Sequence, residues 1–566
     1  MHSKSVMKSK AVIRMICATI CCAFVIQLTA QVTNSIPGDP IRIASGLVSG
    51  TMSPHGVRTY LGIPFAAPPI RENRWRAPQP VHPWNGIWTA NRKPTECLQR
   101  LRASTTNQYF GDSVAGEDCL YLNVWAPAEA KAGIRLPVVV YIYGGAFYVG
   151  SASEPLYAGE QLAKKGVIYI AANYRLGVMG FLAHPDASKE SPGQANGNWG
   201  LLDQIEALKW VKANVQAFGG DPDNVTIVGQ SAGAMSINHL QVSPLAKGLF
   251  KRIVAMSGSA LGGVIATDQD LPAAEEEAVR LAKQLNVTTL AEMRTLPADR
   301  IFAVSQTARV RFGPIIDGYV IPESPEKAFE AGHQIDVPLL TGTTANDMGS
   351  DLLGERVDTL EQYHAQVEKK FGPAAAKIFA EYPAKNDAEA KSRAQQVSEN
   401  SGFFLAARAW ATAQTRTGKQ NAYLYLFARN HPFIAGVRIS DLDPVKAGAY
   451  HTSDVPYWLG TYEAFNLIRP TREWTRWDVE LSNAMQDVIV AFAKTGNPST
   501  DKAPFAAYSR IAEKRTVFGD SIALETLQSA GIDTLELYRP KPAADGPRTP
   551  PVGAVPNAEQ PNRRPD

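Results

Sequence analysis

The chain has 566 residues, of which 45% are hydrophobic and 20% are charged, and its formal net charge is +3 at neutral pH. This composition is typical of a globular protein, and so small a net charge, without basic runs interleaved with aromatic residues, excludes nucleic acid as an expected partner. The length suggests several domains, although large α/β enzymes of this size can form one unit.

The first thirty residues differ from the rest of the chain. Basic residues up to Arg14 precede an uncharged apolar run from Met15 to Ala30. This pattern predicts a secretory signal peptide over 1–30, cleaved near Ala30, and therefore a secreted or periplasmic protein. The alternative is an uncleaved membrane anchor. No later segment has about 18 uncharged apolar residues, so we expect no membrane span in the mature chain.

Cysteine usage agrees with export. Three of the five cysteines lie inside the predicted signal peptide, and the mature chain keeps only Cys97 and Cys119. An oxidising compartment can join such a pair in a disulfide. Two buried free thiols are the alternative. At the other end, residues 540–566 contain eight prolines and almost no large apolar side chains, which predicts a disordered tail.

In chain order, short apolar and β-branched runs alternate with stretches of helical periodicity. Alternation of this kind predicts an α/β fold with a mostly parallel central sheet flanked by helices, and the helix-rich stretch 350–415 predicts a cap region. The expected strands are Pro137–Tyr143, Val167–Ala172, Val225–Val228, Ile253–Met256, Val337–Gly342 and Ala422–Phe427; the expected helices are Leu201–Phe218, 270–300 and Asp478–Lys494.

The strand Val225–Val228 leads into Gly229-Gln230-Ser231-Ala232-Gly233, which fits G-x-S-x-G and is followed by a helix-like stretch. A serine on a sharp strand-to-helix turn presents its hydroxyl above the sheet, and the flanking glycines allow the strand and the helix to approach. A short motif of this kind also arises by chance, but the strand before it and the helix after it are the required context. Ser231 is therefore the predicted nucleophile.

A serine hydroxyl needs a base, and in this class of sheet the acid and then the histidine follow the nucleophile along the chain. His451 lies in a loop of small residues that would expose its ring, and we favour it as the base. The other histidines well beyond Ser231 have simpler interpretations. His364 fits a solvated helix residue, His431 precedes a proline in a loop, and His333 remains a weaker alternative.

The predicted acid is Asp347, in the loop after the strand Val337–Gly342. Such sheets place their functional residues in the loops at the carboxyl ends of strands. Asp317 lies directly before a glycine and is better explained as a turn residue. Asp351 and Glu355 remain local rivals for the role of the acid.

An oxyanion hole needs backbone N–H donors, and two segments can supply them. One is Ala232, the residue after the nucleophile, at the start of the helix. The other is the loop after the strand Pro137–Tyr143, where Gly145 and Ala146 can turn their N–H groups inward. The alternative for this glycine pair is a flexible turn without a role.

Several longer motifs make the chain resemble the type B carboxylesterases, the carboxylesterase/lipase family of the α/β-hydrolase fold that includes the cholinesterases. The motifs are Glu117 to Asn123 (EDCLYLN), Tyr143 to Phe147 (YGGAF), Phe218 to Pro222 (FGGDP) and Gly229 to Ala234 (GQSAGA). The resemblance runs from about Ile41 to Leu537 and implies one catalytic domain over 31–539.

The resemblance implies Ser231 as the nucleophile, His451 as the base, and Gly145, Ala146 and Ala232 as the oxyanion donors. It also implies a disulfide between Cys97 and Cys119, and a serine, Ser257, that supports the acid from behind. The family needs neither a metal nor an organic cofactor, and its partners are small-molecule esters. Oligomeric state is not readable from the sequence.

Three features depart from the family pattern. The usual acid is a glutamate followed by glycine, whereas Asp347 is shorter and is followed by methionine. Gln230 replaces the glutamate that commonly precedes the nucleophile. The 98–118 loop has no tryptophan for cation–π binding of a quaternary ammonium, which argues against a choline-ester specialist. The sequence thus predicts an exported serine esterase; the alternatives are a catalytically silent binding or adhesion protein and an acyltransferase that uses the same triad.

Overall fold

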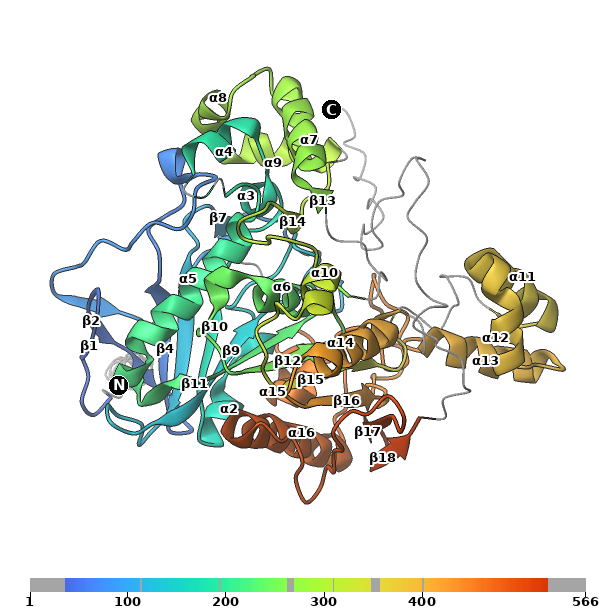
Figure 1. Cartoon of the computed structure of the whole chain (residues 1–566). Helices are drawn as coiled ribbons and strands as arrows, with labels where there is room; N and C mark the ends of the chain where they lie inside the picture. The colour runs from blue at the N-terminus through green and yellow to red at the C-terminus, as the bar shows by residue number, and fades with distance from the viewer. Residues whose placement is uncertain are drawn as a thin grey trace, which may run out of the picture.

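The computed structural model describes residues 36–111, 114–191, 193, 195–261, 269–308, 310–347, 357–399 and 402–527 (Figure 1). The predicted signal peptide and the predicted proline-rich tail lie outside the described residues. None of the helices among these residues is both long enough and apolar enough to cross a membrane.

A large twisted sheet forms the centre of the molecule. In the described residues it has 11 strands in the order β18-β17-β16-β15-β12-β11-β9-β10-β8-β4-β3. Its strands are β3 (Thr51–Met52), β4 (Val57–Pro64), β8 (Tyr121–Pro127), β9 (Leu136–Ile142), β10 (Ile168–Ala172), β11 (Gly220–Gln230), β12 (Arg252–Met256), β15 (Leu339–Thr344), β16 (Ala422–Phe427), β17 (Lys514–Phe518) and β18 (Ile522–Thr526).

The middle of this sheet is parallel and its two edges are antiparallel. The strands from β10 through β9, β11, β12, β15 and β16 to β17 pair in parallel, whereas β8, β4 and β3 on one side and β18 on the other pair antiparallel. The central strands are buried on both faces, as their continuous apolar runs predict. Because parallel strands end at the same edge, the loops after β9, β11, β15 and β16 are brought together.

Helices cover both faces of the sheet. They are α2 (Glu160–Lys164), α3 (Gly177–Phe181), α4 (Pro185–Glu190), α5 (Trp199–Asn214), α6 (Ala232–Val242), α7 (Leu271–Gln284), α8 (Leu290–Thr295), α9 (Ala298–Thr307), α10 (Pro325–Ala331), α11 (Leu360–Phe371), α12 (Ala375–Glu381), α13 (Asp387–Glu399), α14 (Phe403–Thr417), α15 (Val455–Leu459) and α16 (Arg476–Thr495).

Helices α6 and α16 both pack against β11 and β9, and Figure 1 shows them on opposite sides of the sheet. Helix α6 is buried along its whole length, which explains why its sequence lacks charged residues. Helix α14 packs on β15 and β16. The mostly parallel sheet with helices on both faces is the α/β-hydrolase architecture that the sequence predicted.

The helix-rich stretch after β15 divides into two parts. Helix α14 belongs to the main core, whereas α11, α12 and α13 pack on one another around a small core of their own, with Tyr363, Val367 and Ile378 at its centre. Figure 1 shows these three helices at the side of the molecule, beyond α14. The smaller strands β1 (Ile41–Ile43), β2 (Gly46–Ser49) and β5 (Ile87–Thr89) form a separate sheet, and the pairs β6 (Glu96–Cys97) with β7 (Ala115–Gly116) and β13 (Gln269–Asp270) with β14 (Ile315–Ile316) complete the fold.

Candidate active site

Ser231 is the single residue between β11 and α6, and its backbone is strained. Its φ and ψ are 54° and −122°, outside the common regions for a residue with a side chain. Its N–H donates to the carbonyl of Met256, 2.8 Å away on the neighbouring strand. A Cβ on Gly233 would lie 2.0 Å from the carbonyl oxygen of Ile142, so only glycine allows the helix to start this close to the sheet. Ser231 itself is partly exposed.

Asp347 and His451 lie in contact although 104 residues separate them in sequence. Asp347 lies in the loop after β15, which ends at Thr344, and its Oδ1 accepts a hydrogen bond from Nδ1–H of His451. Its Oδ2 accepts from the hydroxyl of Thr343 and from the N–H of Thr344 at 3.3 Å. The carboxylate is thus bound on both oxygens, and the imidazole is left with an unprotonated Nε2 that can accept a proton.

The surroundings shift the pKa values of these two groups in opposite directions. Burial raises the pKa of Asp347, but its contact with His451 and hydrogen bonds from Ser257 and Thr343 outweigh burial and lower it. Burial lowers the pKa of His451, but the charge of Asp347 and its hydrogen bond outweigh burial and raise the pKa above its usual value. The hydrogen bonds that help to lower the pKa of Asp347 come from Ser257, which the resemblance singled out, and from Thr343, which the sequence did not indicate.

Asn346 ties the acid loop to the histidine loop. Its N–H donates to the carbonyl of Ala449 at 2.9 Å, and its side-chain oxygen accepts from the N–H of Ala449 at 2.9 Å. Gly448 has a φ of 58°, and a Cβ there would lie 2.2 Å from the same side-chain oxygen. Nothing in the sequence pattern indicated this role for Asn346, although it stands directly before the predicted acid.

Two further side chains fix the ring of His451. Phe403, the first residue of α14, stacks on it with ring centroids 5.2 Å apart and an interplanar angle of 15°. The side-chain amide of Gln230 lies 3.1 Å from Nε2 of His451. The sequence singled out Gln230 only for the charge that it lacks, and Phe403 carried no signal because it stands far from the motifs.

The loop after β9 offers backbone donors. Gly145, Ala146 and Phe147 have φ values of 111°, 56° and 67° in succession, which is uncommon for the two residues with side chains. The carbonyl of Gly145 accepts the N–H groups of Tyr148 and Val149. Within the described residues, the N–H groups of Gly145 and Ala146, and that of Ala232 at the start of α6, donate no hydrogen bond to another backbone group. These are the three predicted oxyanion donors.

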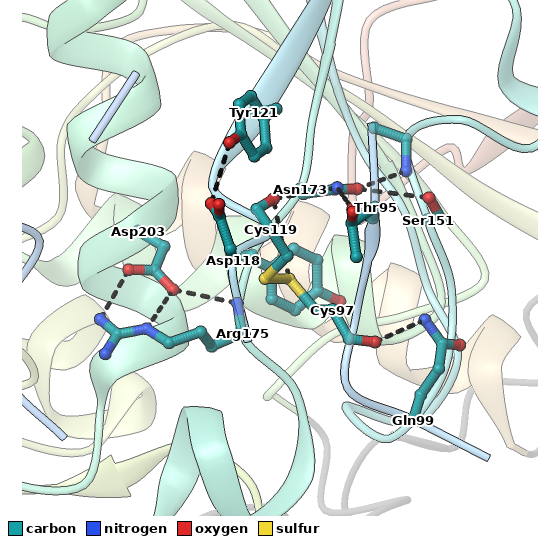
Figure 2. The surroundings of a disulfide bond; sticks show 12 residues. Thr95, Cys97, Gln99, Asp118, Cys119, Tyr121, Ser151, Asn173, Arg175 and Asp203 are labelled. Carbon is teal, nitrogen blue, oxygen red and sulfur yellow. Dashed lines mark hydrogen bonds and ion pairs between the residues drawn. A yellow bond between two sulfur atoms is a disulfide. The ribbon is translucent and has the colours of Figure 1, made fainter. Parts of the chain in front are cut away.

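Cys97 and Cys119 form a disulfide, as the sequence predicted. Figure 2 shows its surroundings, where Asn173 donates to the carbonyl of Cys119 at 3.0 Å. Gln99 donates to the carbonyl of Cys97 at 3.1 Å (Figure 2). It also donates to the carbonyl of Gly150 at 2.8 Å, and its side-chain oxygen accepts the N–H of Gly150 at 2.8 Å. Gln99 therefore joins the disulfide to Gly150, at the far end of the loop that follows β9.

The alternative histidines lie elsewhere. His333 is exposed and contacts Glu323 at 2.6 Å, and His364 is exposed on α11. His431 is buried, between the carbonyl of Ser453 and the hydroxyl of Tyr450. Burial, reinforced by the charge of a neighbouring arginine, lowers the pKa of His431 to about 3, so it stays neutral.

Among the alternative acids, Asp317 is the turn residue that the sequence suggested, since one of its oxygens accepts three backbone N–H groups. Asp351 and Glu355 lie outside the described residues. A further carboxylate, Asp454, is fully buried close to the site. Its Oδ2 accepts hydrogen bonds from Tyr425 at 2.8 Å and Trp458 at 3.3 Å, while its Oδ1 has no partner among the described residues. Burial raises the pKa of Asp454 to about 6.

The sheet order and the serine on the turn from β11 to α6 define an α/β-hydrolase. The profile of the carboxylesterase family matches residues 39–523, and the chain belongs to that family. By fold and family it is a carboxylesterase. No group of three or more histidine, cysteine or acidic side chains in the described part of the chain could hold a metal ion.

Individual relatives agree with this assignment. The chain is 34% identical to para-nitrobenzyl esterase of Bacillus subtilis (strain 168) over 85% of this chain and 94% of the relative. It is 38% identical to fumonisin B1 esterase of Sphingopyxis macrogoltabida, over 63% of this chain and 65% of that protein. A solved structure of a PNB esterase superimposes with a TM-score of 0.71 at 31% identity, covering 89% of this chain and 99% of the other.

Proposed function

We propose that the chain is an exported hydrolase of small to medium carboxylic esters that acts through an acyl-enzyme. The observation that carries this proposal is the contact between Asp347 and His451, formed beside the strained serine of the strand-to-helix turn. A histidine held by a carboxylate next to a partly exposed serine is the arrangement that activates a hydroxyl for nucleophilic attack.

In the first half of the reaction, the hydroxyl oxygen of Ser231 attacks the ester carbonyl and its proton passes to Nε2 of His451. Asp347 stabilises the imidazolium, and the raised pKa of His451 favours this protonated form. The carbonyl oxygen becomes an oxyanion that accepts hydrogen bonds from the N–H groups of Gly145, Ala146 and Ala232. The carbon–oxygen bond to the alcohol then breaks, and His451 returns the proton to the leaving alcohol.

In the second half, a water molecule attacks the acyl-enzyme. His451 takes a proton from the water, the oxyanion forms again against the same three N–H groups, and the bond to Ser231 breaks with return of the proton to its oxygen. The products are a carboxylic acid and an alcohol. The carboxylate of Asp347 stays ionised throughout, which agrees with its lowered pKa.

The relatives support an ester substrate without selecting one. Three of them are named as a para-nitrobenzyl esterase, a fumonisin B1 esterase and a cocaine esterase. A panel of aryl, alkyl and bulkier esters, assayed for kcat/KM on the purified protein, ranks the substrate classes for this chain.

Export rests on the predicted signal peptide, and the disulfide supports it because disulfides persist in oxidising compartments. N-terminal sequencing of the protein recovered outside the cytoplasm tests this part of the proposal, and a mature N-terminus close to residue 31 is the expected result. A chain recovered with its first thirty residues intact would contradict cleavage.

Replacement of the nucleophile tests the enzymatic proposal. We expect Ser231→Ala to lower kcat by roughly 10⁴-fold or more, because the remaining groups act only together with the serine. Labelling by a fluorophosphonate should disappear with it, while Ser509→Ala, at an exposed position, keeps both. Ester hydrolysis at the normal rate in a folded Ser231→Ala variant would refute the assignment.

A further inference from the structure

The side chain of Gln230 contacts Nε2 of His451, the atom that must accept the proton of Ser231 in the proposed reaction. Its amide nitrogen lies 3.1 Å from Nε2. The Nδ1–H of the imidazole donates to Asp347, so in the neutral ring Nε2 carries the lone pair and accepts. The amide N–H of Gln230 is therefore the donor in this contact.

Nε2 has a single lone pair in the plane of the ring, and two donors next to it compete. Ser231, adjacent to Gln230 in sequence, needs the same lone pair for its hydroxyl proton. In the described residues the hydroxyl of Ser231 makes no hydrogen bond, to His451 or to any other group. The structure therefore shows a resting arrangement in which Gln230, and not Ser231, holds the base.

The backbone and the side chain of Gln230 are both held in place by their surroundings. It is the last residue of β11, pairs with Met256 of β12 and is only 2% exposed. A Cβ on Gly144 would lie 2.6 Å from its backbone carbonyl oxygen and 2.9 Å from its side-chain oxygen. Glycine at 144 thus leaves the space that the carboxamide fills, with its oxygen toward Gly144 and its nitrogen toward His451.

We propose that Gln230 is a positioning residue that holds His451 in a neutral resting state and competes with Ser231 for Nε2, so that each turnover begins with the exchange of Gln230 for Ser231. This inference rests on the proposed function. A carboxamide suits such a role because its rotation presents an oxygen to the imidazolium once Nε2 is protonated, whereas a carboxylate can only accept and favours the charged ring throughout.

Two variants separate these effects. Gln230→Met keeps the approximate volume of the side chain and removes the competing donor. Fluorophosphonate labelling of Ser231 at a pH above the pKa of His451 should therefore become roughly two- to tenfold faster, which corresponds to the free energy of one neutral hydrogen bond. Gln230→Glu places a charge next to the imidazole, so the acidic limb of the kcat/KM profile should move up by about one pH unit or more. Gln161→Glu, with the same added charge on α2, should match the wild type.

The pH profile is measured as the ratio of rates at several pH values within each preparation, so a loss of folded protein does not alter its shape. An unchanged acidic limb in Gln230→Glu, or labelling of Gln230→Met at or below the wild-type rate, would overturn the inference. If Ser231 is labelled in the wild type but both variants have the wild-type labelling rate and pH profile, the proposed role of Gln230 is wrong and the proposed function stands. If Ser231 is never labelled, the proposed function fails as well.

Discussion

The two halves of the candidate site are built by different means. The turn that carries Ser231 is fixed by the packing of backbone against backbone, since Gly229, Gly233 and Gly258 have no space for a Cβ. The half that carries Asp347 and His451 is fixed by hydrogen bonds and charge between loops. We therefore expect substitutions in the first half to cost stability and activity together, and substitutions in the second half to change rate and pH dependence in a protein that still folds.

The largest effect is expected in the polar half. Asp347→Asn removes the charge that stabilises the imidazolium and should lower kcat by roughly 10³- to 10⁴-fold, with little change in thermal unfolding. Because the carboxylate raises the pKa of His451, its removal should also move the acidic limb of the residual activity to lower pH. Stopped assays of kcat/KM between pH 5 and 8 measure both changes.

Asp351→Asn is the matched control, since Asp351 is the sequence rival for the same role and we expect its replacement to leave kcat unchanged. The opposite outcome, a normal rate in Asp347→Asn and a severe loss in Asp351→Asn, would transfer the role of the acid to the neighbouring residue.

The steric half should respond through stability. Gly233→Ala places a methyl group 2.0 Å from the carbonyl oxygen of Ile142, and neither backbone can move away without displacing β9 or α6. We expect the free energy of unfolding to fall by about 3 kcal/mol, the upper part of the usual range for overpacking, together with loss of activity. Gly519→Ala, where the nearest atom would be 3.6 Å away, is the control for urea unfolding. A stable and active Gly233→Ala variant would show that the turn adapts.

A smaller effect is expected at Asp454, which belongs to neither half. Its folded pKa of about 6 lies above its ordinary value, so the folded state binds this proton more tightly than the unfolded state. The stability it contributes is complete below its ordinary pKa and is lost as the pH rises to about 6. Asp454→Asn keeps an acceptor for Tyr425 and Trp458 and no longer has to ionise, so it should exceed the wild type by about 2 kcal/mol at pH 8.

The corresponding measurement is urea unfolding of both proteins at pH 4 and pH 8. The difference between their free energies of unfolding should shrink at the lower pH. If the wild type were the more stable protein at pH 8, the result would contradict a carboxyl group that is buried with one oxygen unpartnered among the described residues. Unfolding is the readout here rather than activity, because the charge of Asp454 also contributes to the raised pKa of His451.

More of the half that carries Ser231 could be predicted from the sequence than of the half that carries Asp347 and His451. The β-branched run before Ser231, the glycines around it and the helix after it describe a local structure, and local patterns can be read from neighbouring residues. The central strands, the long helices α5 and α16 and the disulfide were likewise predicted. Strands β17 and β18 were not, since their alternation is short. Strand β17 joins the sheet by pairing with the distant β16, and β18 is added to β17 by a short antiparallel turn.

The partners of His451 could not be predicted in the same way. Phe403 comes from α14, Asn346 from the loop after β15 and Gln230 from the end of β11. Their meeting at the ring or its loop depends on how these separate elements pack. Long-range contacts of this kind depend on tertiary packing, for which a single sequence holds no periodic signal.

The bond between Cys97 and Cys119 has a practical consequence through Gln99. This side chain forms hydrogen bonds with both Cys97 and Gly150, so the disulfide helps to hold the far end of the loop that carries Gly145 and Ala146, the proposed oxyanion donors. A host cell whose cytosol keeps thiols reduced would produce this chain without the crosslink, and the loop would lose one of its supports. Recombinant enzyme should therefore be directed to an oxidising compartment, or oxidised during refolding, before its catalytic constants are compared with those of its relatives.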